Sequence, residues 1–80
     1  MRYYCGLDLH GDNVYCGIVD SDGKRVFKKR LANDIDEIVK ALDPFRGELV
    51  EVAVESTFNW YWLVDGLAEK NYPVKLVNPA

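Results

Sequence analysis

The hydrophobic period of the chain changes near residue 33, and this change limits the possible folds more than any other feature of the sequence. Before it, three short runs over 2–9, 14–19 and 24–31 are separated by tight turns at 10–13 and 20–23. Strands joined by such short turns form an antiparallel meander. After it, apolar residues recur with the helical spacing i, i+3, i+4 and i+7, at Ile35, Ile38, Val39 and Leu42.

Capping residues mark the ends of two predicted helices. Asn33 suits the start of the first helix, and Pro44 and Gly47 suit its end. The second helix is predicted over about 59–70, with Ser56 or Thr57 as its cap. Asn71 is the predicted C-terminal cap of that helix.

Two further strands complete the predicted order, one over 49–54 and one over 73–77. The order is therefore β-β-β-α-β-α-β, and the helical crossovers make the last two strands parallel to their neighbours. This is the opening of a ribonuclease H-like α/β fold, with a mixed sheet in the order 3-2-1-4-5, truncated after the fifth strand. Eighty residues hold one such partial domain, 1–80, and no second core.

Charge and composition exclude several classes of protein. Ten basic against thirteen acidic residues give a net charge of −3, which argues against a free-standing nucleic-acid binder that works by bulk charge. The sequence has no apolar run long enough for a membrane span, and Asp8 interrupts any signal-peptide core, so we expect a cytoplasmic protein. Cys5 and Cys16 lack metal-site spacing and are predicted to be buried thiols.

Half of all basic residues lie on the predicted third strand, which is an edge of the sheet. They are Lys24, Arg25, Lys28, Lys29 and Arg30. Lysines on an edge strand protect it against aggregation, and this is the favoured interpretation. A strip that contacts phosphates is the alternative.

Two carboxylates fall at the ends of neighbouring strands. Asp8 ends the first strand and Glu55 ends the fourth, and these are parallel neighbours about 4.8 Å apart in the predicted sheet. Ligand sites of open α/β sheets lie beyond the carboxyl ends of the strands. Like charges at this distance call for a cation, and oxygen ligands suit Mg²⁺ or Mn²⁺. The alternative is a pair of solvated turn acids.

Strand alternation gives the carboxylate face a floor of small residues. Gly6, Gly17 and Ala53 share this face with Asp8 and Glu55. The opposite face holds the larger apolar residues Leu7, Leu9, Cys16, Ile18, Val50, Val52 and Val54. Small residues allow close approach, so we expect another element to pack there, such as a helix beyond residue 80. Alternatively, the glycines relieve crowding in a twisted sheet.

The second predicted helix begins with a cluster of aromatic residues, Trp60, Tyr61 and Trp62. Packing in a core or interface is favoured for this cluster over stacking on nucleic-acid bases. His10 follows Asp8 by two residues, and a structural role in the turn is favoured for it.

Three segments together resemble the DEDD transposases of bacterial and archaeal insertion sequences. Residues 6–10 (Gly-Leu-Asp-Leu-His) resemble the first motif of that family. Residues 54–57 (Val-Glu-Ser-Thr) and 59–63 (Asn-Trp-Tyr-Trp-Leu) resemble the second, and 74–80 is similar to the strand that follows. The resemblance covers nearly the whole chain. Phe58 departs from it, because many members have glycine there, and this puts the local shape at the start of the second helix in doubt.

The resemblance implies a RuvC-like domain in which four acids bind divalent metal and cleave and join DNA strands at the ends of an insertion sequence. Asp8 matches the first acid and Glu55 the second, so both are implied to be catalytic and metal-binding. The other two acids belong to a helix after the fifth strand, and a downstream domain supplies a serine nucleophile. The characterised branches of the family use a guide RNA.

These implications lead to expectations for the 80-residue chain. With two of four acids it should bind Mg²⁺ or Mn²⁺ weakly and be catalytically inactive. Its open sheet edge and uncovered face favour a dimer or a domain-swapped oligomer. Two alternatives remain: a sugar-kinase or actin-like nucleotide-binding domain with the 8–13 hairpin against phosphates, and a non-catalytic module in which the 60–62 aromatics and the third strand bind protein or RNA.

Overall fold

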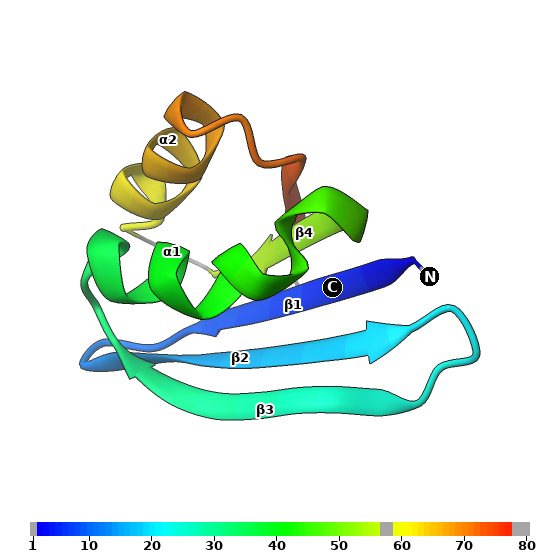
Figure 1. Ribbon diagram of the computed structural model, residues 1–80. Coiled ribbons are helices and arrows are strands. Elements are labelled where there is room, and N and C mark those ends of the chain that lie inside the picture. The colour runs from blue at the N-terminus through cyan, green and yellow to red at the C-terminus, as the bar shows by residue number, and fades with distance from the viewer. Residues whose placement is uncertain (1, 57–58, 78–80) are drawn as a thin grey trace.

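One mixed five-stranded sheet carries both helices on a single face in the computed structural model, which describes residues 2–56 and 59–77 (Figure 1). The strand order β3-β2-β1-β4-β5 confirms the predicted order. β1 and β3 run antiparallel to β2, and β4 runs parallel to β1 and β5. The elements are β1 (Tyr3–Leu9), β2 (Asn13–Asp20), β3 (Arg25–Ala32), α1 (Ile35–Leu42), the 3₁₀ helix η1 (Asp43–Glu48), β4 (Leu49–Glu55), α2 (Tyr61–Glu69) and β5 (Val74–Val77).

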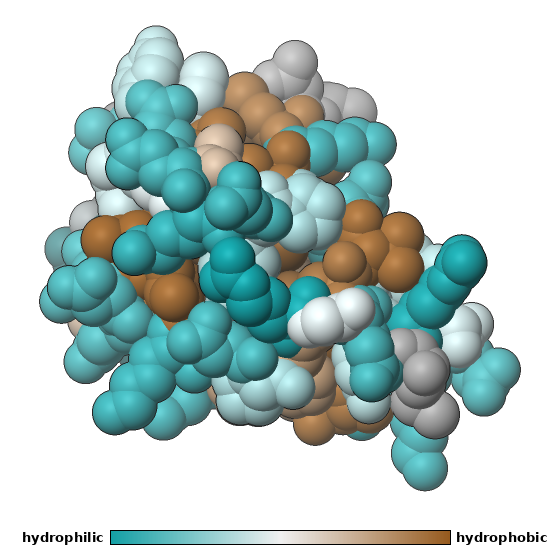
Figure 2. All heavy atoms as spheres, turned by 45° about the horizontal axis from the view of Figure 1, so that its top comes forward, coloured by the Kyte–Doolittle hydropathy of each residue, from teal (hydrophilic) through white to brown (hydrophobic). Residues whose placement is uncertain are grey.

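The core lies between the sheet and the two helices. Alternate residues of β1, β2 and β4 point into it, together with the apolar stripe of each helix. Its most deeply buried side chains are Leu7, Val14, Cys16, Ile18, Ile38, Leu42, Val52, Val54, Leu63 and Leu67. Seen from the helical side, hydrophilic residues cover much of the surface and hydrophobic residues show between them (Figure 2).

The face of the sheet that bears Asp8 and Glu55 carries neither α1 nor α2, and we call it the open face (Figure 1). Within residues 2–56 and 59–77, no helix has both the length and the apolar character that crossing a membrane requires.

The first helix is capped by Asp34, so the prediction of Asn33 was wrong. The Asp34 carboxylate accepts a hydrogen bond from the backbone N–H of Asp36 at 2.9 Å. The Asn33 amide instead donates to the carbonyls of His10 and Gly11, at 3.2 and 3.1 Å. Asn33 therefore ties the β1–β2 turn to the end of β3, a long-range contact that local spacing does not reveal.

The α-helix α1 ends at Leu42, just before Pro44, which confirms the predicted end of the first helix. Pro44 lies in the first turn of η1, where its lack of a backbone N–H costs no helical hydrogen bond. α1 passes directly into η1, and helical structure continues to Glu48.

The second helix starts later than predicted, with Trp60 at its N-cap position and no side-chain cap. Ser56 is therefore not its cap, and Thr57 and Phe58 lie outside the described residues. Asn59 has a φ of 57°, a left-handed conformation that cannot belong to a right-handed helix, so the helix begins after it. Asn71 has a φ of 65° just past the C-cap, which confirms its predicted role.

A bulge in β4 overturns the predicted burial of Val50. Tyr3 pairs with Leu49 and Tyr4 pairs with Glu51, so Val50 is an extra residue in the ladder. Its side chain is 42% exposed, whereas Leu49 is turned into the core. The alternation of buried and exposed residues along the strand does not predict this burial, because the position of the bulge depends on the pairing with β1.

The two cysteines are buried free thiols, as predicted. The Sγ atoms of Cys5 and Cys16 lie 3.8 Å apart on the core face of β1 and β2. The contact with Cys16 and burial raise the pKa of the Cys5 thiol, which keeps it protonated at neutral pH.

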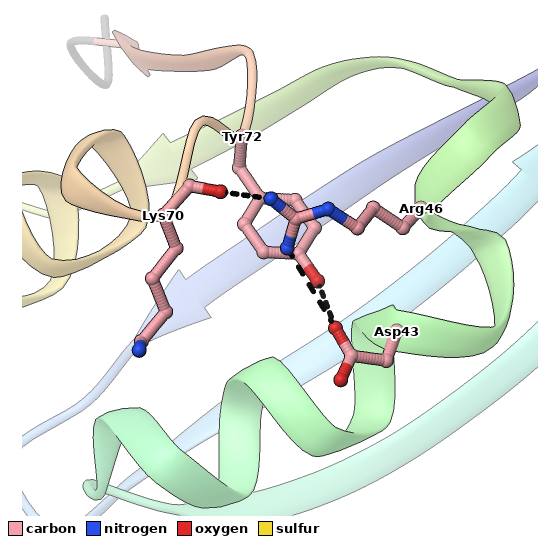
Figure 3. A network of polar contacts seen from close by, with 4 residues as sticks. All are labelled: Asp43, Arg46, Lys70 and Tyr72. Atoms are coloured by element: carbon pink, nitrogen blue, oxygen red, sulfur yellow. Dashed lines mark hydrogen bonds and ion pairs between the residues drawn. The ribbon is translucent and has the colours of Figure 1, made fainter.

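A polar network joins η1 to the segment after α2 (Figure 3). The Tyr72 hydroxyl donates to the Asp43 carboxylate at 2.6 Å. The Arg46 guanidinium lies over the Tyr72 ring, 4.6 Å from its centroid, and donates to the carbonyl of Lys70. Burial and the hydrogen bond to Asp43 raise the pKa of Tyr72 to about 12.

We predict that Tyr72→Phe lowers the free energy of unfolding by about 1–2 kcal/mol at pH 7, because a hydrogen bond to a charged acceptor is lost. The raised pKa means that the folded state holds the Tyr72 proton more tightly than the unfolded state. This stabilisation is complete below pH 10 and is lost as the pH rises from 10 towards 12. Urea unfolding between pH 7 and 11 measures both effects.

Tyr61→Phe is the matched control, because the Tyr61 side chain is 62% exposed on α2. It should leave stability unchanged at pH 7. If the stability of Tyr72→Phe fell with rising pH as steeply as that of the parent chain, the alkaline loss of stability would not come from Tyr72.

Candidate active site on the open face

Asp8 and Glu55 are direct neighbours at the carboxyl ends of β1 and β4. They form a register pair of the parallel ladder, and both are exposed on the open face. Paired residues of adjacent strands point to the same side of a sheet, with strands about 4.8 Å apart. The structure thus brings together the two acids that the sequence singled out.

His10 lies against Asp8, a contact that the sequence analysis did not predict. The His10 Nε2 atom is 3.2 Å from the Asp8 Oδ2 atom, and both side chains are about half exposed. The His10 backbone N–H donates to the carbonyl of Asn13 at 2.8 Å, which closes the β1–β2 turn. The useful signal was the spacing of two residues across a strand end, where the turn brings the side chain back towards the carboxylate.

A row of polar side chains crosses the sheet from β3 to the two acids. The register pairs Arg30 with Tyr15, Tyr15 with Asp8, and Asp8 with Glu55. The Arg30 guanidinium donates to the Tyr15 hydroxyl and lies 5.0 Å from the centroid of its ring. The His10 ring packs edge-on against the Tyr15 ring, with the two ring centroids 5.4 Å apart.

The next row of the register is made of small residues and forms the floor of a hollow. Gly17 pairs with Gly6, and Gly6 pairs with Ala53. Lys28 and Lys75 continue this row at its two ends. The hollow above it has a volume of about 340 Å³, and Asp8 and Glu55 both line it.

These glycines do not relieve crowding in the described chain. A methyl group added to Gly6 or to Gly17 would meet no atom within 4 Å. The alternative explanation from the sequence is therefore wrong, and the floor is open to whatever approaches the two carboxylates.

The donors at this edge of the sheet are too few to enclose a divalent cation. Within 2–56 and 59–77 there is no group of three or more His, Cys, Asp or Glu side chains that could hold a metal ion. Asp8 and Glu55 offer carboxylate oxygens, which suit Mg²⁺ or Mn²⁺, but such ions take six or more ligands. Solvent or further side chains would have to complete the coordination.

The aromatic cluster divides between the core and the surface. Trp62 packs against the core, as expected, whereas Tyr61 is exposed and stacks on Trp60 with ring centroids 4.2 Å apart. None of the three lines the hollow beside Asp8.

We predict that Gly6→Ala and Gly17→Ala leave the free energy of unfolding unchanged or raise it by up to about 1 kcal/mol, because alanine restricts the unfolded chain and meets no neighbour. Gly23→Ala is the contrasting control. Gly23 has a φ of 81°, so alanine there should cost about 1 kcal/mol. Urea denaturation measures all three, and a clear loss for Gly6→Ala or Gly17→Ala would mean that the floor is already covered.

Comparison with known proteins identifies the family. A family model for transposases of the IS110-type DEDD group matches residues 5–80. Comparison with curated proteins gave no match. The matched segment contains β2 to β5, most of β1, and both Asp8 and Glu55. The chain therefore belongs to the IS110-type DEDD transposase family.

Proposed function

We propose that Asp8 and Glu55 are two of the metal-binding carboxylates of a DNA transposase, which cleaves and joins DNA strands at the ends of an insertion sequence. The observation that carries this proposal is their direct pairing at the carboxyl ends of β1 and β4. The family match to transposases supports it independently of the geometry.

Electrostatics favours a cation at this pair. Two carboxylates on adjacent strands repel each other, and a divalent ion between them removes that cost. The Asp8 side chain is 55% exposed, so an ion can reach it from solvent. Mg²⁺ or Mn²⁺ fits these hard oxygen donors better than a thiol- or imidazole-preferring metal.

The residues of the chain divide the work in this proposal. A bound divalent ion would polarise a phosphodiester and stabilise the charge that develops on its oxygens. Asp8 and Glu55 would hold the ion, and His10 would keep the Asp8 carboxylate in place from the side of the turn. The floor of Gly6, Gly17 and Ala53 leaves room for the substrate or for another protein element to come close.

The wider assignments follow from the family resemblance and belong to the same proposal. Two further acids on a helix after β5 would pack against the open face and complete the metal site. A guide RNA, a cytoplasmic location and a homo-oligomeric assembly are proposed for the intact enzyme. Membership of a transposase family argues against the nucleotide-binding alternative.

We predict that Mn²⁺ added to the isotope-labelled chain broadens amide NMR signals most strongly around Asp8 and Glu55. Asp8→Asn and Glu55→Gln should each weaken this effect by about tenfold or more, because one of two charged ligands is lost. Glu51→Gln is the matched control, since Glu51 also lies on β4 but pairs with Lys75 at 3.5 Å. Broadening that survives in both site variants, or that is centred elsewhere, would contradict the proposal.

We also predict that the 80-residue chain does not cleave DNA in the presence of Mg²⁺, because two carboxylates hold a catalytic ion too weakly. In a longer protein that contains this chain, Asp8→Asn and Glu55→Gln should each lower strand cleavage by more than about a hundredfold. A gel assay on DNA with insertion-sequence ends measures both. Metal-dependent cleavage by the 80-residue chain that Asp8→Ala abolishes would refute the prediction of inactivity.

A further inference from the structure

The outer edge of β3 has no strand partner among the described residues, since β3 is the first strand of the sheet order. Ile18 pairs with Phe27 and Val19 pairs with Arg25, so Val26 is a bulged residue near the start of the strand. Beyond this bulge, residues 27–32 continue as regular strand. Their outward N–H and C=O groups form a template for one more strand.

A groove runs along this edge on the helical side of the sheet. It has a volume of about 510 Å³ and lies between β3, α1 and η1. Its apolar lining residues are Phe27, Leu31, Ala41, Pro44 and Phe45, and its charged lining residues are Lys29, Arg30, Glu37 and Lys40. The Phe27 and Phe45 rings meet edge-on at 5.9 Å and give the groove a rigid base.

The other side of the same edge is strongly basic. Arg25, Lys28 and Arg30 pair with open-face residues of β2, so they lie on the open face of β3. This concentration of positive charge contrasts with the net charge of −3 for the whole chain. The edge strand thus offers cations on both sides, together with the apolar side chains of the groove on the helical side.

We propose that the edge of β3 binds an extended, acidic segment of a partner protein as an additional strand. Successive side chains of a strand point to opposite faces of a sheet. A segment in which acidic and apolar residues alternate would place its carboxylates beside Arg25, Lys28 and Arg30 and its apolar side chains in the groove. Backbone hydrogen bonds would supply affinity, and the two faces would supply specificity.

The same observations argue against other occupants. A second copy of this chain that paired through its own β3 would set basic residues against basic residues, which is unfavourable. A nucleic-acid backbone would use the cations on both sides but leave the apolar side chains of Phe27, Leu31 and Phe45 uncovered. Arg25 and Lys28 also line the hollow beside Asp8 and Glu55, but addition of a strand at β3 needs no metal ion in that hollow, so the two proposals can fail separately.

A synthetic peptide of about ten residues that alternates Glu with Val is the direct probe. It should protect outward-pointing amides of 27–32 from hydrogen exchange and shift the NMR signals of α1 and η1. A peptide of equal composition, with its Glu and Val residues in two blocks, should bind about fivefold more weakly or worse. Absence of protection, or equal binding of both peptides, would overturn the proposal.

Two pairs of variants test the open-face cations and the groove separately. Lys28→Glu should weaken binding of the alternating peptide about fivefold or more, and Lys70→Glu, an exposed change after α2, should not. Ala41→Glu, which places a carboxylate in the groove, should weaken binding similarly, whereas Ala68→Glu on the exposed side of α2 should not. If a single-stranded DNA oligonucleotide bound this edge and the alternating peptide did not, the basic strand would be a phosphate contact instead.

Discussion

The parallel pairing of β1 with β4 is the interaction on which the rest of the structure depends. On one side of the sheet it sets Leu7 beside Val54, and these side chains close the core under the helices. On the other side it sets Asp8 beside Glu55. Because the side-chain period of a strand is two, a one-residue slip of this pairing would turn the apolar set out of the core, and the observed register pairs the two acids on the opposite face. Stability and the candidate site therefore share one cause.

Charge is distributed unevenly over the sheet, and the strand order explains how. The basic residues of β3 stand at the outer edge, two strands away from Asp8 on β1. The row that joins Arg30, Tyr15 and Asp8 links the two regions through a guanidinium–tyrosine contact. A chain with a net charge of −3 thus keeps a strongly basic edge beside its acidic pair, and the two regions are suited to different partners.

The features that depend on hydrophobic period and turn length could be predicted from the sequence. The predictions failed where the position of a side chain depends on a strand or turn that is distant in the chain. Strand order and the neighbouring acids followed from short turns, helical crossovers and strand-end positions. Val50 was misplaced because the bulge opposite β1 is a property of the strand pair. The Asn33 cap was wrong because its amide bonds the β1–β2 turn, a contact between residues more than twenty positions apart. The position of His10 against Asp8 likewise emerges only when the turn closes.

Among the described residues, the hollow of the open face has small residues beneath it and only two carboxylates in its lining, and together these features limit where further metal ligands could lie. Two carboxylates supply fewer ligands than a divalent cation needs, and 2–56 and 59–77 hold no third acid in reach. A further ligand from the protein would have to come from an element that lies directly over the sheet, close to Asp8 and Glu55. Side chains larger than those of Gly6, Gly17 and Ala53 would hold such an element several ångströms higher. The small size of Gly6, Gly17 and Ala53 is therefore part of the proposed metal site, because it sets how near the remaining ligands could come.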